Sequence, residues 1–165
     1  MGIDEKHTVM VDLDSMSFKR VKDLAESACS HFKLGGFIIL KSSPNHYHVV
    51  FDKPMRYWSD VLRVISWIDI LADSPNVWKW VCMQAIKKTC TLRVSEKTTE
   101  NGVKPKPRMV YRYGSRHRQI KAYLKRRREI LGILRKLNAQ IHMCSIYLRA
   151  CFLCACNNFF VERVS

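Results

Sequence analysis

Two aspartates and two histidines, each pair at alternate positions, are the residues of this sequence best suited to chemistry. Asp12 and Asp14 follow the apolar segment 9–11, and His46 and His48 follow a Ser-Pro-Asn turn. Because side chains alternate between the faces of a strand, each pair should point to one face. Two carboxylates on one face repel each other unless a cation lies between them, and Mg²⁺ or Mn²⁺ prefers such oxygen ligands. The four residues therefore indicate metal-assisted chemistry on phosphate groups.

The aspartates also have a purely structural interpretation. Asp14, Ser15 and Ser17 are all suitable caps for a helix that follows the first strand. An Asp-x-Asp pattern alone does not decide between a metal site and a helix cap.

The turn before the histidines carries a more specific pattern. Hydroxyls of Ser42 and Ser43, turn amides and an imidazole could together donate hydrogen bonds to a phosphate. Farther along the chain, Arg93 and Lys97 could also reach a phosphate, although an ordinary surface strand end has the same pattern.

The charge balance favours a polyanionic partner. The chain has 165 residues, a formal net charge of +15 and a pI of about 9.8, so nucleic acid is the expected partner, with a merely soluble basic surface as the alternative. No uncharged apolar run reaches 18 residues, so no membrane partner is expected. The cationic residues expected to contact nucleic acid are Arg112, Arg116, Arg118, Lys121, Lys125, Arg126, Arg127 and Arg128.

Seven cysteines and a polar N-terminus favour reduced thiols in an intracellular protein. Cys151, Cys154 and Cys156 could bind zinc with His142, but their spacing fits no standard zinc finger. A buried or partner-packing helix over 139–161 is the favoured alternative.

Hydrophobic periodicity predicts the elements that position these residues. The predicted order is β-α-β-β-α-β, a split ferredoxin-like α+β unit with an antiparallel sheet and helices on one face. Residues 1–115 would form this domain, and residues 116–165 a basic helix (116–137) and a cysteine-rich apolar helical tail. Strands are predicted over 7–14, 37–43, 46–52, 89–94 and 108–113, helices over 17–33, 55–72 and 75–87, and a loop over 95–107.

Three segments together resemble a known family. Val-Asp-Leu-Asp (11–14), Lys-Ser-Ser-Pro-Asn-His-Tyr-His-Val-Val-Phe (41–51) and Leu-Arg-Val-Ser-Glu-Lys (92–97) are similar to motifs of the archaeo-eukaryotic primase superfamily. This family includes the primase-polymerases of archaeal plasmids and viruses. The resemblance covers about residues 8–113, and it implies an RNA-recognition-like (RRM-like) palm that performs two-metal nucleotidyl transfer with Mg²⁺ or Mn²⁺.

The resemblance also implies roles for individual residues. Asp12 and Asp14 would be catalytic metal ligands, and His48 a catalytic residue that contacts the nucleotide. The third metal-binding carboxylate of the family is not obvious, and Asp69 and Asp73 are the candidates. The nucleotide-binding residues implied by the motifs are Ser42, Ser43, His48, Arg93 and Lys97.

The implied partners are a DNA template, nucleoside triphosphates and a replicative helicase or another replication protein. The implied location is the cytoplasm, that of the host cell if a virus or plasmid encodes the chain.

Two other functions fit the same residues. A rolling-circle replication initiator, which is an endonuclease, uses a His-hydrophobic-His strand such as His46-Tyr47-His48 to bind one metal, with Tyr123 as the nucleophile here. A non-catalytic nucleic-acid-binding module would need only the basic surface.

Overall fold

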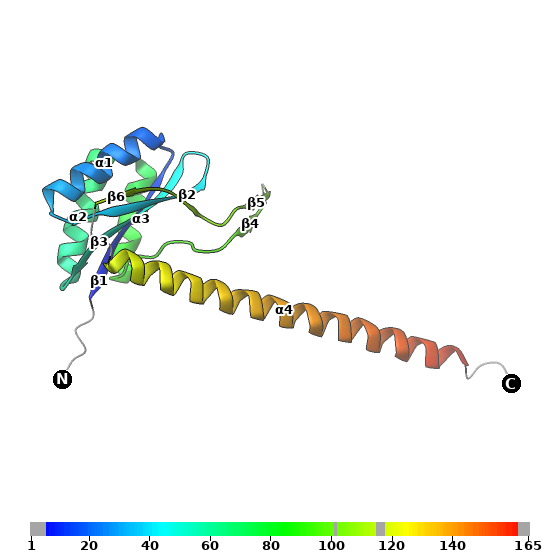
Figure 1. Ribbon diagram of the computed structural model, residues 1–165. Coiled ribbons are helices and arrows are strands. Elements are labelled where there is room, and N and C mark those ends of the chain that lie inside the picture. The colour runs from blue at the N-terminus through cyan, green and yellow to red at the C-terminus, as the bar shows by residue number, and fades with distance from the viewer. Residues whose placement is uncertain (1–5, 101, 115–117, 162–165) are drawn as a thin grey trace. The chain divides into compact units, whose positions relative to one another are not determined.

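The structure, a computed structural model, describes residues 6–100, 102–114 and 118–161, and for residues 141–161 it describes the backbone alone. The described residues form an α+β fold with a four-stranded antiparallel sheet, a two-stranded ribbon and four helices (Figure 1). The chain divides into two compact units, Met1–Arg126 and Arg127–Ser165. The elements are β1 (His7–Asp14), α1 (Phe18–His31), β2 (Phe37–Ser43), β3 (His46–Met55), α2 (Trp58–Ala72), α3 (Pro75–Lys87), β4 (Lys97–Thr99), β5 (Gly102–Lys104), β6 (Arg108–Tyr113) and α4 (Arg118–Val161).

The sheet has the order β1-β3-β2-β6, and all neighbouring strands are antiparallel. β1 and β2 therefore run parallel to each other, with β3 inserted between them. A two-residue turn joins β2 to β3, and Asn45 in this turn has a positive φ of 58°. Asparagine adopts this left-handed conformation more readily than most residues, and the Asn45 carbonyl accepts a 3.0 Å hydrogen bond from the backbone N–H of Met16.

Helices α1, α2 and α3 cover one face of the sheet. Val9, Val11 and Leu13 of β1 are buried in the same core as the apolar stripes of these helices. Helix α1 begins at Ser17, whose Oγ accepts a hydrogen bond from the N–H of Arg20 at 3.2 Å. Ser17, rather than Asp14, therefore provides the cap of this helix.

The predicted strand 89–94 is wrong, because this segment is irregular. The side chain of Gln84 accepts hydrogen bonds from both the backbone N–H and the hydroxyl of Thr91, each at 3.0 Å. The Cys90 thiol contacts the backbone of Met10, so the segment lies beside β1 without pairing as a strand. The predicted loop 95–107 is also only partly correct, since it contains the ribbon of β4 and β5.

Helix α4 continues through the point at which the sequence predicts two separate helices. Its start is tied to the sheet, because the backbone N–H of Ile120 donates a 3.0 Å hydrogen bond to Oδ1 of buried Asp52. Ile120 is buried against Ile38, Leu40 and Val50, on the face opposite α1–α3. The first turns of α4 thus belong to the sheet unit, which extends beyond the predicted boundary at residue 115. Within the described residues, no helix is both long and apolar enough to span a bilayer.

Candidate functional site

Two aspartate–histidine pairs lie across β1 and β3, on the sheet face that α1–α3 leave uncovered. Asp12 is the register partner of His48, and Asp14 is the register partner of His46. His46 Nδ1 lies 2.6 Å from Asp14 Oδ1, whereas His48 Nε2 lies 3.5 Å from Asp12 Oδ1. The alternation of each strand puts both pairs on one face, because Val11 and Leu13 occupy the helix-covered core. The structure therefore brings together the four residues that the sequence singles out.

Asp12 is electrostatically the most perturbed residue of this site. Burial, followed by the neighbouring Asp14 carboxylate, raises the pKa of Asp12 from 3.8 to about 7. The positive charges of Arg93 and Lys104 and the proximity of His46 act in the opposite direction. A divalent cation between the carboxylates would offset their repulsion and favour the ionised form.

Arg93 links three segments beside this pair. Its guanidinium donates hydrogen bonds to the carbonyl of Pro105 at 2.8 Å and to that of Ser42 at 3.3 Å. Burial lowers the pKa of Arg93, and the Asp12 carboxylate opposes that change. The side chain thus holds the hairpin of β2 and β3 next to the 104–105 segment, and it also supplies positive charge to Asp12.

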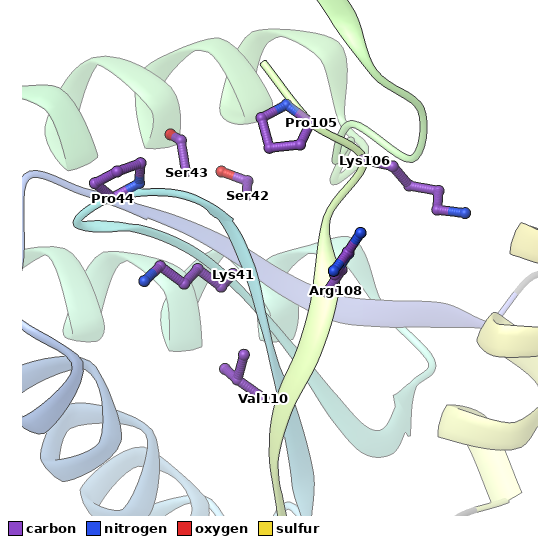
Figure 2. A pocket seen from close by; sticks show the side chains of 8 residues that line it. All are labelled: Lys41, Ser42, Ser43, Pro44, Pro105, Lys106, Arg108 and Val110. Carbon is purple, nitrogen blue, oxygen red and sulfur yellow. The ribbon is translucent and has the colours of Figure 1, made fainter. Parts of the chain in front are cut away.

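The hairpin serines lie close to the histidines. Buried Ser42 donates from Oγ to the carbonyl of His46 at 3.4 Å, and Ser43 is the register partner of His46. Both serines line a surface pocket at the end of the hairpin (Figure 2). Lys97 is exposed on β4, opposite Lys104 of β5, so it belongs to the ribbon rather than to the sheet.

Neither candidate for a third carboxylate reaches this face. Asp69 is half-buried on α2, and Asp73 is the exposed residue that ends that helix in a left-handed conformation. Since α2 packs on the same face as Val11, the sheet separates both residues from Asp12. The prediction of Asp69 or Asp73 as a metal ligand beside Asp12 and Asp14 is therefore corrected.

Within the described residues, no group of three or more His, Cys, Asp or Glu side chains has an arrangement that could hold a metal ion. Mg²⁺, however, is commonly bound by one or two carboxylates together with substrate phosphates. Asp12 and Asp14 fit this kind of site, because Asp12 Oδ1 is buried and accepts no hydrogen bond within the described part of the chain.

The predicted nucleic-acid-binding residues are distributed over two elements. Arg112 is exposed on β6 and is the register partner of Ile38, which places it on the same face as Asp12. Arg116 lies outside the described residues, as do the side chains of the cysteines and the histidine considered for zinc. The remaining predicted residues lie on α4, where Arg127 is half-buried and the others are exposed: Arg118, Lys121, Lys125, Arg126 and Arg128.

Two residues near the site are absent from the sequence-based prediction. Asp52 lies four residues after His48 on β3, and this even separation could have indicated that both side chains share one face of the sheet. Its carboxylate, however, caps the start of α4. Lys104 acts on Asp12 from the ribbon, and no local pattern in the sequence places it there.

Comparison with known proteins gives no match to a family model, to a curated protein or to a solved structure. The functional conclusion therefore depends on the residues and their geometry.

Proposed function

We propose that this protein is a nucleotidyltransferase of the primase-polymerase type, which adds nucleotides to a 3′-hydroxyl on a DNA template. The observation that carries the proposal is the arrangement of Asp12 and Asp14 opposite two histidines, on a sheet face next to Arg93. A net charge of +15 supports a nucleic-acid partner. The proposed compartment is the cytoplasm, where a template and nucleoside triphosphates are both present.

The proposed fold assignment is an RRM-like or ferredoxin-like palm. The insertion of β3 between the parallel strands β1 and β2 supports it, because that arrangement is the split β-α-β unit. The sheet also departs from it. Its last strand, β6, pairs with β2, and β1 has Cys90 of the irregular segment beside it rather than a paired strand.

The roles of the residues follow from their positions. Asp12 and Asp14 would hold Mg²⁺ or Mn²⁺ together with the substrate phosphates. When bound, these ions would lower the pKa of the attacking 3′-hydroxyl and neutralise the leaving pyrophosphate. His46 would orient the Asp14 carboxylate through their 2.6 Å contact. Buried His48 would contribute its imidazole from β3 to the binding of a phosphate.

The proposal is tested by incubating the protein with labelled nucleotides, a primed or single-stranded DNA template and Mg²⁺ or Mn²⁺. Wild-type protein should give elongated products, and Asp12→Asn should abolish them. Asp23→Asn is a matched control, since Asp23 is exposed on α1, on the other side of the sheet. Elongation that survives Asp12→Asn would contradict the proposal.

A second candidate, the rolling-circle endonuclease, is favoured by one observation. Tyr123 packs against the cluster of Leu40 and Val50 on the same sheet face as His46 and His48. The phenol thus approaches that face from the start of α4, as a tyrosine nucleophile would need to do. If Tyr123→Phe removes a covalent protein–DNA product while Asp12→Asn keeps it, the endonuclease replaces the polymerase. Salt-sensitive DNA binding without either product would indicate a binding module.

A further inference from the structure

A cationic surface pocket lies beside the hairpin of β2 and β3. It encloses about 400 Å³, and its charged residues come from β2 (Lys41), from the link before β6 (Lys106) and from β6 itself (Arg108) (Figure 2). Its remaining lining includes the two hairpin serines and no acidic residue. All three cationic side chains are exposed, so each can reach a ligand from solvent.

The position of two of these charges is unfavourable for the protein alone. Lys41 and Arg108 are direct register partners across β2 and β6. Like charges in directly opposite positions of an antiparallel pair are destabilising. None of the three cationic residues forms an ion pair with a carboxylate in the described residues. An anion bound between Lys41 and Arg108 would remove the repulsion.

The geometry points to a phosphate. A guanidinium can donate two parallel hydrogen bonds to phosphate oxygens, and an ammonium adds a strong point charge. The half-buried hydroxyl of Ser43 provides a further donor at the same rim, whereas the hydroxyl of buried Ser42 already donates to the carbonyl of His46. Pro44, Pro105 and Val110 form the rest of the wall.

We propose that this pocket binds a phosphate group of the substrate, through Lys41, Lys106 and Arg108. Lys41 is the register partner of Tyr47 and of Arg108, and Tyr47 belongs to the core under α1–α3, so these two cations lie on the opposite face of the sheet from Asp12. A single phosphate therefore cannot contact both the pocket and Asp12, and the two sites would bind different phosphates. The choice of ligand class rests on the proposed function, because that function supplies the phosphates of a nucleic-acid strand and those of a nucleotide.

The test compares Lys41→Ala/Arg108→Ala with a control of equal charge change, Lys19→Ala/Lys79→Ala, whose residues are exposed on α1 and α3. The probes are a fluorescent single-stranded oligodeoxynucleotide, titrated at several salt concentrations, and ATP with Mg²⁺. Each lost contact to a strand phosphate should reduce the slope of log K against log salt by about 0.7, so the pocket variant should lose about 1.4. The control should keep the wild-type slope.

A reduced slope for the oligonucleotide assigns the pocket to the backbone phosphates of the strand. Weaker ATP binding with an unchanged slope assigns it to the nucleotide instead, and both results support a phosphate pocket. If the pocket variant and the control behave alike with both probes, the proposal is overturned. Lys106→Ala is a second variant, expected to have about half the effect.

This experiment is separate from the test of catalysis. Asp12→Asn should stop nucleotide incorporation without a reduced salt slope, whereas the pocket variant should change binding even if the protein proves not to be a polymerase. A result that overturns the phosphate pocket can therefore be distinguished from a result that overturns the proposed function.

Discussion

Replacement of Asp12 by asparagine should stabilise the folded protein above neutral pH while it abolishes the proposed activity. Asp12 has a pKa of about 7 in the folded state, raised from 3.8 by burial and by Asp14. The folded protein therefore prefers the protonated carboxyl, and ionisation of Asp12 costs free energy. Asparagine has a similar shape and carries no charge, so the variant avoids this cost.

The magnitude follows from the difference between the two pKa values. A difference of about 3 units corresponds to about 4 kcal/mol at roughly 1.4 kcal/mol per unit, and this is an upper limit because the surroundings can relax. Below about pH 4 the carboxyl is protonated in both the folded and the unfolded state, so no cost arises. The cost grows between about pH 4 and pH 7 and is complete above pH 7.

The assay is urea or thermal unfolding in the presence of a metal chelator, at pH 5 and pH 8. The advantage of Asp12→Asn should be larger at pH 8 than at pH 5, and added Mg²⁺ or Mn²⁺ should stabilise the wild type but not the variant. Asp23→Asn should show no such gain, because Asp23 is exposed. An Asp12→Asn protein no more stable than the wild type at pH 8, or equally stabilised at both pH values, would refute the electrostatic reasoning.

Three further predictions concern the scaffold and can be checked by urea unfolding. Asp52→Ala should lower the free energy of unfolding by about 1–2 kcal/mol, because it removes the acceptor at the start of α4; no loss would mean that this cap adds nothing. Gly114→Ala should cost about 2 kcal/mol or more, since φ is +88° and a Cβ would lie 2.5 Å from the Gly35 carbonyl oxygen, whereas Gly132→Ala in open space on α4 should gain about 0.5–1 kcal/mol. Equal effects at the two glycines would contradict this reasoning. Arg93→Lys should cost about 1–3 kcal/mol, because one ammonium cannot replace the forked contacts of the guanidinium with several carbonyls; an unchanged midpoint would exclude a bridging role.

Much of the sheet unit is predictable from hydrophobic periodicity. β1 and β2 have the predicted bounds, and the buried stripe of α1 follows the predicted helical spacing. The segment 89–94 shows where periodicity fails. Its residues have a high propensity for strands, but the backbone N–H of Thr91 donates its hydrogen bond to the side chain of Gln84. That N–H is therefore not available to a neighbouring strand. A contact made by a side chain of the preceding helix thus overrides local preference.

The long segment before β6 is a second place where hydrophobic periodicity does not predict the structure. Residues 95–107 are polar and contain two prolines and a glycine, which is typical of a loop, yet a short ribbon forms within them. Strands of three residues carry too few alternating positions for periodicity to reveal. The ribbon nevertheless matters, because it brings Lys104 close enough to influence Asp12.

The sequence by itself determined that Asp12 and Asp14 lie on the same side of their strand, and that His46 and His48 lie on the same side of theirs, because alternation along a strand follows from local backbone geometry. Only the tertiary structure decided that the two pairs meet, since the register of β1 against β3 depends on the packing of both strands in one core. It also excluded Asp69, through the side of the sheet on which α2 packs, and placed Lys41 opposite Arg108. Such pairings join residues distant in the chain, and no local spacing encodes them.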